Sequence, residues 1–136
     1  MDKKENMMWL EIDIEPKAKG RPRVGARGNV YTPYSTRAYE SAIRIECRSY
    51  MKRRRYKQIT GAARVFLSFH FKRPKSHKGV DYPHTQKPDI DNLIKAVLDG
   101  MNGTVYHDDC QIVELSATKS FADADSVTIC VSEARV

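Results

Sequence analysis

An uninterrupted apolar stripe on one predicted helix is the feature that most restricts how this chain can fold. Between Ile90 and Met101 the apolar residues recur at steps of three and four, the period of an α-helix with one buried face. The stripe consists of Ile90, Leu93, Ile94, Val97, Leu98 and Met101. The Pro-Asp pair before it and Gly100 near its last residue are typical of a helix start and a helix end. Such a helix needs a second layer to cover its apolar face, so we assign these residues to the core.

Four further segments alternate apolar and polar residues with the two-residue period of a half-buried β-strand. They are residues 8–15, 63–72, 113–121 and 127–131. Because only the short stretch Ala122-Asp123-Ala124-Asp125 and its neighbours separate the last two segments, we expect these two to pair as a β-hairpin.

A second helix is predicted in the first half of the chain, from a cap at Ser35 or Thr36 to about Arg55. Its apolar residues Tyr39, Ile43, Cys47 and Tyr50 recur at steps of three or four. The order strand, helix, strand, helix, strand, strand predicts an α+β fold, with a mixed or antiparallel sheet of about four strands and two main helices packed on it. A chain of 136 residues can bury one core but not two, so we expect a single domain over residues 1–136.

The chain is strongly basic, with a formal net charge of +7 and a pI near 9.4. A charge of this sign attracts polyanions, and nucleic acid is the commonest polyanion available to a cytoplasmic protein. Net charge alone is equally compatible with a role in solubility. The placement of the basic residues therefore has to decide between the two explanations.

The basic residues gather in two predicted loops and along one helix face. The first loop, residues 16–29, mixes Lys and Arg with Gly and Pro, and we expect it to be mobile and without regular structure. The second loop, residues 72–78, follows a predicted strand. We expect DNA phosphates to be contacted by Lys19, Arg21, Arg23 and Arg27 of the first loop, Arg44 and Arg48 of the helix, and Lys75 of the second loop. For the helix residues, a solvated face paired with Glu40 and Glu46 is an equally good explanation.

Composition disfavours several other classes of protein. Cys47, Cys110 and Cys130 are scattered singly, which fits neither a disulfide framework nor a zinc ribbon, so we expect reduced cysteines that serve packing. The histidines have no cysteine partners at zinc-finger spacing. The chain has no apolar run of membrane-spanning length, and its N-terminus lacks the apolar core of a signal peptide. We therefore expect a cytoplasmic protein that does not bind membranes.

The start of the helix at residues 89–100 carries the first candidate site. Asp91 and Lys95 are four residues apart and therefore project from the same helix face, while Asp89 can turn its carboxylate toward Asp91. Each residue also has an ordinary structural explanation. Asp89 can be the N-cap, Asp91 a first-turn acid that the helix dipole favours, and Asp91 with Lys95 a surface ion pair. For an isolated D-x-D-N motif the structural explanation is the better one.

A second acidic pair changes this assessment. Asp108 and Asp109 follow an Asn102-Gly103 turn and the short run 104–107, and we expect the turn to fold the pair back toward the helix start. Three or four carboxylates at one point repel one another unless a cation lies among them, and hard oxygen ligands suit Mg²⁺ or Mn²⁺. An acidic centre surrounded by basic residues is typical of catalysis on a phosphodiester rather than of binding alone.

The two acidic stretches read K-P-D-I-D-N-L-I-K-A-V-L-D-G at residues 87–100 and H-D-D-C-Q-I-V at residues 107–113. Together they resemble the RusA-like family of Holliday junction resolvases. The upstream stretches Lys19-Gly20-Arg21-Pro22-Arg23 and Tyr31-Thr32-Pro33 are similar to the N-terminal region of many family members. One departure is Cys110, which stands where Ala or Ser is commoner.

The resemblance implies a site and an activity. Its metal ligands correspond to Asp89, Asp91 and Asp109, with Asp108 as a further candidate ligand, and its essential lysine corresponds to Lys95. It also implies a magnesium-dependent enzyme, for which Mn²⁺ can substitute. The enzyme would be a homodimer that binds four-way DNA junctions and makes paired nicks in opposing strands during recombination and repair.

Three other interpretations fit some of the same residues. A nuclease of the P-D...(D/E)-x-K type is disfavoured, because that pattern needs an acid and a lysine that alternate along a strand, and Lys95 follows Asp91 by four residues on a helix. A non-catalytic DNA-binding protein, whose aspartates only cap and pair, stays an alternative. So does a metal-dependent nuclease that acts on other branched DNA.

Overall fold

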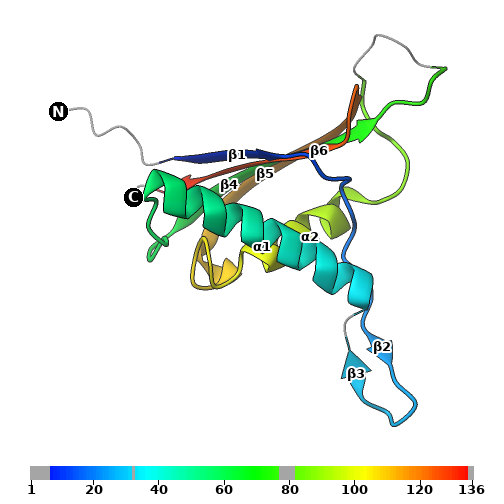
Figure 1. The fold of residues 1–136 in the computed structure, drawn as a ribbon, viewed down its shortest axis with the longest axis horizontal. Helices are drawn as coiled ribbons and strands as arrows, with labels where there is room; N and C mark the ends of the chain where they lie inside the picture. Colours follow the sequence, from blue (N-terminus) through cyan, green and yellow to red (C-terminus); the bar gives the residue numbers. More distant parts are fainter. Residues whose placement is uncertain (1–6, 32, 77–81, 135–136) are drawn as a thin grey trace.

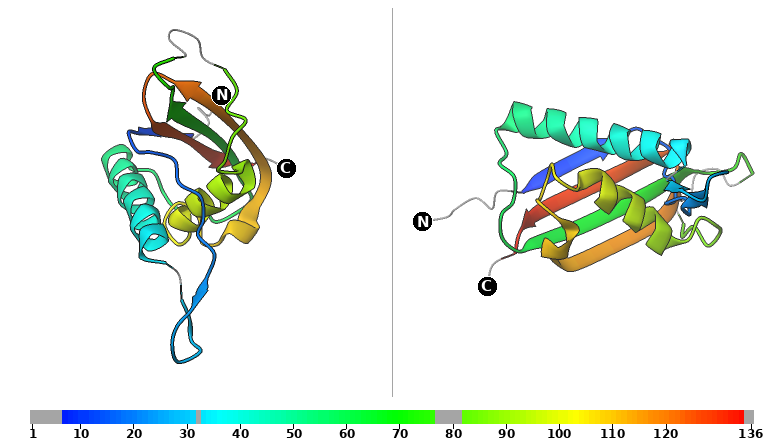
Figure 2. Two further views of the ribbon diagram at one scale, coloured as in Figure 1. Left: turned by 90° about the vertical axis from the view of Figure 1, so that its right-hand side faces the viewer. Right: turned by 90° about the horizontal axis from the view of Figure 1, so that it is seen from below.

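Two helices lie on the same face of a four-stranded β-sheet (Figure 1, Figure 2). This computed structural model describes residues 7–31, 33–76 and 82–134. The sheet has the order β1–β6–β4–β5, with strands β1 (Met8–Ile12), β4 (Ala63–Lys72), β5 (Ile112–Ala122) and β6 (Ser126–Glu133). The helices are α1 (Tyr34–Arg54) and α2 (Ile90–Met101). The predicted α+β class with a mixed sheet is confirmed.

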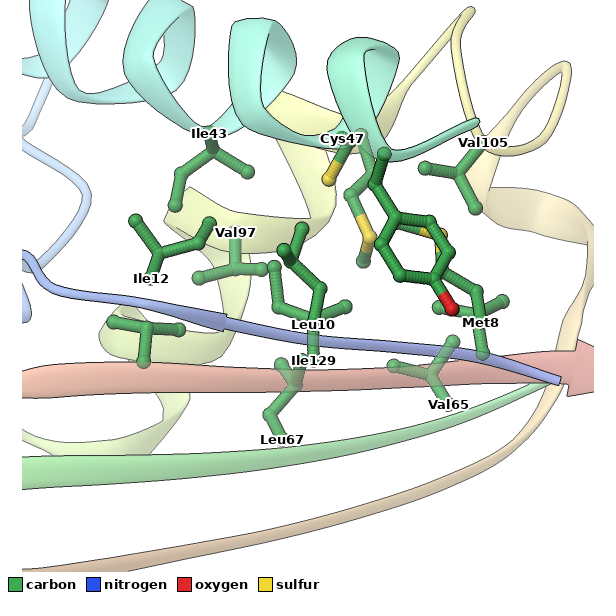
Figure 3. Close-up of a cluster of buried hydrophobic side chains, with 14 of the residues drawn as sticks. Met8, Leu10, Ile12, Ile43, Cys47, Val65, Leu67, Val97, Val105 and Ile129 are labelled. Carbon is green, nitrogen blue, oxygen red and sulfur yellow. The ribbon is translucent and has the colours of Figure 1, made fainter. Parts of the chain in front are cut away.

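The core lies between the helices and the sheet. Figure 3 shows how side chains from β1, β4 and β6 meet side chains from both helices, among them Leu10, Leu67, Ile129, Ile43 and Val97. Of the stripe predicted on α2, Leu93, Val97 and Met101 are fully buried, whereas Ile90, Ile94 and Leu98 are only partly covered. Cys47 is buried in the same core, and burial raises the pKa of its thiol to about 12, so it serves packing.

The last two strands do not form the predicted hairpin. β5 pairs with β4 in parallel, and β6 pairs with β4 on its other side and antiparallel to it, so β4 separates the two. The connection 123–125 crosses the end of β4, where Arg73 N–H donates to Ala122 O and Lys72 N–H donates to Asp125 Oδ1, each at 2.8 Å. The hairpin prediction was wrong because neighbours in sequence need not be neighbours in a sheet. The chain returns through α2 between β4 and β5, which makes these two strands parallel.

Helix α1 begins earlier than predicted. Its N-cap position is Pro33, without a side-chain cap, and neither Ser35 nor Thr36 caps the helix. The hydroxyl of Thr36 instead accepts a hydrogen bond from Gly20 N at 3.1 Å. Thr36 is therefore used to fasten the preceding basic segment to α1.

That basic segment contains regular structure that was not predicted. Strand β1 ends at Ile12, and β2 (Arg23–Val24) pairs antiparallel with β3 (Val30–Tyr31). Gly28 adopts φ +80° in the tip between them, a conformation that glycine tolerates without strain. We call residues 21–31 the hairpin arm; it projects from the molecule beside the start of α1 (Figure 1).

The second predicted basic loop is described only in part. Residues 72–76, which we call the β4 arm, follow β4 directly. His77 and Lys78, which the prediction included, lie outside the described residues.

Candidate active site

Asp89 and Asp91 lie together at the start of α2. Asp89 occupies the N-cap position with an extended backbone, but its side chain makes no capping hydrogen bond, so the capping explanation is wrong for its carboxylate. The Asp89 side chain is 57% exposed, and its Oδ1 lies 3.7 Å from Lys87 Nζ. Asp91 is exposed in the first turn and accepts a hydrogen bond from Asn92 N at 2.9 Å. The N-terminal end of the helix dipole favours both negative charges at this position.

Lys119 holds the segment that enters this site, and sequence reasoning missed it. The Lys119 side chain donates to two backbone carbonyls, Gln86 O at 2.5 Å and Pro88 O at 2.7 Å. Pro88 directly precedes Asp89, so the ammonium group fixes the backbone that carries the first carboxylate. The signal was a lysine in the line Leu115, Ala117, Lys119, Phe121, which is otherwise the apolar face of β5.

The same segment is anchored to the edge of β5 by backbone and aromatic contacts. Phe121 N–H donates to Tyr82 O at 2.8 Å, and His84 N–H donates to Lys119 O at 3.3 Å. The buried His84 ring stacks on Phe71 with a centroid distance of 4.1 Å. Burial first, and then the charge of Lys119, lower the pKa of His84 below its ordinary value, so the ring stays neutral at neutral pH.

Lys95 forms its ion pair with Asp99 and not with Asp91, which was the expected partner. Lys95 Nζ lies 3.8 Å from Asp99 Oδ2, one turn further along α2. Asp99 Oδ2 also forms an ion pair with Lys19 Nζ, at 3.0 Å. The Lys95 side chain remains 61% exposed, so its ammonium group can still reach a ligand on the surface of α2.

Lys19 differs from the other residues that were expected to contact DNA. Its side chain is only 18% exposed and forms ion pairs with Glu40 and Asp99. Burial alone would lower the pKa of Lys19, but the hydrogen bonds and charges of these two carboxylates outweigh it and raise the pKa. Its backbone N–H donates to Asn92 O at 3.0 Å. Lys19 thus ties the base of the hairpin arm to α1 and α2, next to Asp91.

Asp108 and Asp109 belong to a short 3₁₀ helix, η1 (Asp109–Gln111), that leads into β5. Asp108 caps it by accepting from Cys110 N at 3.0 Å, and hydrogen bonds from Cys110 lower the pKa of the Asp108 carboxyl. The Gln111 side chain completes the capping box by accepting from Asp108 N at 2.8 Å. Asp108 thus has a structural role as the cap of η1.

Asp109 is half-buried in the same 3₁₀ helix, close to Tyr106. Burial and then the charge of Asp109 raise the pKa of Tyr106, whose hydroxyl donates to Leu98 O at 2.7 Å. None of these contacts makes the Asp109 side chain a cap of η1.

The predicted convergence of the two acidic pairs does not occur within one chain. Gln111 Nε2 donates to Ile59 O and Gly61 O, so η1 lies where β4 begins, whereas Asp89 follows the segment held at Lys119. At about 3.3 Å per residue, the strand between Ile112 and Lys119 spans about 23 Å. Figure 2 shows η1 and the start of α2 toward opposite ends of the sheet. Within residues 7–31, 33–76 and 82–134, no three Asp, Glu, His or Cys side chains are grouped so that they could hold a metal ion.

The donor set within one chain fits a divalent cation only in part. Mg²⁺ often binds through one or two carboxylates, with water and substrate phosphates as its other ligands. Asp89 and Asp91 supply two exposed carboxylates of this kind. Asp109 of the same chain is too distant to be the third.

Basic residues are exposed on two segments at the end of the molecule that carries Asp89 and Asp91. The hairpin arm exposes Arg21, Arg23 and Arg27, and the β4 arm exposes Lys75. Both arms extend at the end where α2 starts (Figure 1, Figure 2). On α1, Arg48 is exposed, while the half-buried Arg44 donates to Asp99 O at 3.5 Å.

A comparison with known protein families shows which family this chain belongs to. The family model described as endodeoxyribonuclease RusA matches residues 13–132. The chain belongs to the RusA endodeoxyribonuclease family. Uncharacterized protein YqaN of Bacillus subtilis (strain 168) is 30% identical to it, over an alignment of 133 residues that covers 88% of this chain and 91% of YqaN.

The RusA match spans the hairpin arm, both ends of α2 and η1 in one alignment. RusA proteins are Holliday junction endodeoxyribonucleases, so the family context is that of an enzyme that cuts branched DNA. Neither helix in the described part of the chain is long and apolar enough to cross a membrane.

Proposed function

We propose that this RusA-family protein is a magnesium-dependent, structure-specific endonuclease that resolves four-way DNA junctions by paired nicks. The observation that carries the proposal is the exposed Asp89–Asp91 pair at the start of α2, at the end of the molecule from which the two basic arms extend. An acidic pair weakens binding to a polyanion, so its place among basic residues is best explained by catalysis.

Each group in the site has a role that its surroundings support. Asp89 and Asp91 would hold Mg²⁺, which when bound would polarise the phosphodiester and neutralise developing charge. Lys95, on the exposed face of α2, would contact the phosphate that changes charge during in-line attack by water. Lys119 would keep the Asp89 backbone in place throughout. The products would be a 3′-hydroxyl and a 5′-phosphate.

The basic residues would bind the arms of the junction through phosphate contacts. Arg21, Arg23 and Arg27 are exposed on the hairpin arm and Lys75 is exposed on the β4 arm, and both arms extend at the end of the molecule where α2 starts (Figure 1). Arg48 extends the basic surface along α1. Lys19 is better explained as the anchor of the hairpin arm, because its ammonium group is already paired with Glu40 and Asp99.

The test is a magnesium titration with a labelled synthetic four-way junction, with linear duplex, flap and fork DNA assayed in parallel. We expect Mg²⁺-dependent cleavage of the junction and little cleavage of the duplex. Asp91→Asn should abolish cleavage while junction binding is kept or tightened, because a negative charge near the phosphates is removed. Glu133→Gln, at the end of β6, is the matched control and should cleave normally.

Other results of this experiment would contradict particular parts of the proposal. Equal loss of binding and cleavage in Asp91→Asn would contradict its catalytic role. Cleavage that persists in EDTA would rule out the metal. Binding without cleavage under any divalent ion would indicate a non-catalytic DNA-binding protein, and preferred cleavage of flaps or forks would indicate another branched substrate.

A further inference from the structure

The carboxylate of Asp99 faces two ammonium groups that come from different parts of the chain. Its Oδ2 lies 3.0 Å from Lys19 Nζ, just before the hairpin arm, and 3.8 Å from Lys95 Nζ, one turn earlier on α2. Glu40 of α1 forms a second ion pair with the Lys19 ammonium. The side chains of Lys19, Glu40 and Asp99, which we call the Lys19 cluster, are each less than one-fifth exposed. The Lys95 side chain is 61% exposed.

The position of Asp99 on α2 explains why its carboxylate needs a cation from outside the helix. Asp99 lies in the last turn of α2, where the helix dipole disfavours a negative charge, and that turn contains no basic residue. Lys95 precedes Asp99 by four residues, and a lysine that precedes its acid forms the weaker of the two possible i,i+4 ion pairs. Arg44 of α1 donates to the backbone carbonyl of Asp99, at 3.5 Å. Lys19 is therefore the main cation that stabilises this carboxylate.

Lys19 is fixed in its place by the backbone as well as by its side chain. Its N–H donates to Asn92 O at 3.0 Å, near the start of α2, and the N–H of Gly20 donates to Thr36 Oγ1 at 3.1 Å. A Cβ at Gly20 would lie 2.5 Å from the same Thr36 oxygen, so this segment packs closely on α1. The Lys19 ammonium is thus held beside Asp99, whereas the exposed Lys95 side chain has room to move.

Two ammonium groups that share one carboxylate oxygen compete for it. The attraction rises as the distance falls and as water is excluded, so Lys19, at 3.0 Å and 18% exposed, outcompetes Lys95, at 3.8 Å and 61% exposed. Without the charge of Lys19, Asp99 would attract the Lys95 ammonium more strongly, and the two would form an ion pair along the helix. That pair would turn the Lys95 ammonium toward the end of α2, away from Asp91, which lies one turn before Lys95.

We propose that Lys19 is a positioning residue, which occupies the Asp99 carboxylate and so leaves the Lys95 ammonium free to contact the DNA phosphate. The inference rests on the proposed function, in which Lys95 makes that contact. It gives the Lys19 cluster a role beyond anchoring the hairpin arm, because the base of the arm and the lysine of the active site are linked through one carboxylate.

Single-turnover cleavage of the four-way junction, at saturating protein and Mg²⁺, tests this competition. Lys19→Met should lower the cleavage rate about 10- to 100-fold, the range for losing a group that positions a ligand or a reacting group. Junction affinity in EDTA should stay that of the wild type, because Lys19 does not contact phosphates. Adding Asp99→Asn to Lys19→Met should restore most of the rate, since it removes the carboxylate that captures Lys95.

The matched control adds Glu40→Gln to Lys19→Met. This substitution also removes one of the two carboxylates that have lost Lys19, and so it relieves the fold to a similar degree, but it leaves Asp99 in place. The cleavage rate should therefore stay low, and urea unfolding compares the stabilities of the two double variants. If Lys19→Met does not fold, Lys19→Gln, which removes the charge but can still donate to Glu40, takes its place in each variant.

The reactivity of Lys95 toward an acylating reagent tests the same competition without cleavage. An amine held in an ion pair reacts more slowly than a free one, and mass spectrometry of the digested protein measures each lysine separately. Lys95 should react more slowly in Lys19→Met than in the wild type, and at least as fast as in the wild type once Asp99→Asn is added. Lys57, exposed after α1, is the internal control and should react equally in all variants.

Three results would overturn the inference when the wild type cleaves the junction. The first is an unchanged cleavage rate in Lys19→Met. The second is equal recovery, or no recovery, with Asp99→Asn and with Glu40→Gln, which would show that Lys19 only stabilises the fold. The third is unchanged Lys95 reactivity in Lys19→Met. If the wild type cleaves nothing at any Mg²⁺ concentration, the proposed function fails, and the acylation rates still show whether Lys19 and Lys95 compete for Asp99.

Discussion

Lys119, a half-buried lysine of β5, fixes the backbone that leads to Asp89, the proposed metal ligand, without touching the carboxylate itself. Its two hydrogen bonds go to carbonyls directly before Asp89. We predict that Lys119→Met folds but loses about 10- to 100-fold in Mn²⁺ affinity and in cleavage rate, the range for losing a group that orients metal ligands. Calorimetry and junction cleavage measure the two effects.

The control for Lys119→Met is Lys57→Met, which removes an exposed lysine after α1. This variant should keep the Mn²⁺ affinity of the wild type. If both variants lose cleavage equally with unchanged Mn²⁺ affinity, the loss comes from weaker DNA binding and Lys119 does not position the site.

His84 makes stability depend on pH. Its folded-state pKa lies below the ordinary 6.5, first because the ring is buried and then because Lys119 is positively charged. As pH falls below about 6.5, the unfolded chain takes up a proton that the folded chain does not, so acid destabilises the fold. We predict that His84→Phe, which keeps the stacking on Phe71, lessens this acid-induced loss, by at most about 1.4 kcal/mol per pH unit. Urea unfolding from pH 7 to pH 5 measures the difference, and parallel curves for both proteins would contradict the prediction.

At the scale of residues, motif and spacing placed Asp89, Asp91 and Lys95 correctly on one helix start. They could not show which side chains the tertiary fold brings to them. Lys119 is 24 or more residues away from each of these three in the sequence, and it reaches the site because the segment before Asp89 runs along the edge of β5. Conversely, Asp108 matches a ligand by type but caps η1, and the D-x-x-Q spacing to Gln111 was the signal for that cap.

The crossing of α1 and α2 depends on a glycine. A Cβ at Gly100 would lie 2.9 Å from Ile43 Cβ and 3.2 Å from Glu40 O, neither of which is the end of a flexible side chain. We predict that Gly100→Ala destabilises the fold, because overpacking costs about 1–3 kcal/mol and exceeds the gain of about 1 kcal/mol in helix propensity. Urea unfolding measures this. Gly61→Ala, where a Cβ meets no atom within 4 Å, should change stability little. A stabilised Gly100→Ala would show that the helices can move apart freely.

At the scale of elements, periodicity predicted β4 and α2 to within a residue or two, because both are long and one-sided. It failed where structure depends on contacts that are distant in sequence. The pairing of β6 is set by β4 and β1 on its two sides, and no alternation of residues shows which strands are neighbours. The hairpin arm was missed because β2 and β3 have two residues each, too few for any period.

For the whole molecule, basic charge was predicted from composition, but its distribution is a property of the fold. The hairpin arm and the β4 arm come from distant parts of the sequence and extend at the same end as the start of α2 (Figure 1). Further basic residues lie in the last turn of α1, at the end of that helix away from the hairpin arm. Three basic residues of the hairpin arm and three at or after the end of α1 carry the same charge but differ in their position relative to the acidic pair. Variants of the two sets can therefore be compared directly.

We predict that position, and not net charge, controls junction binding. Replacing Arg21, Arg23 and Arg27 by Gln should weaken binding and reduce the slope of log K against log salt by about 0.9 for each phosphate that the variant no longer neutralises. The matched variant replaces Lys52, Arg53 and Lys57, exposed at or after the end of α1, and removes the same charge. Binding is measured in EDTA, so that no strand is cut, at several salt concentrations. Because the second set lies far from Asp89 and Asp91, it should leave the slope nearly unchanged. Equal slopes for the two triple variants would mean that the hairpin arm attracts DNA only through net charge and does not touch the phosphates itself.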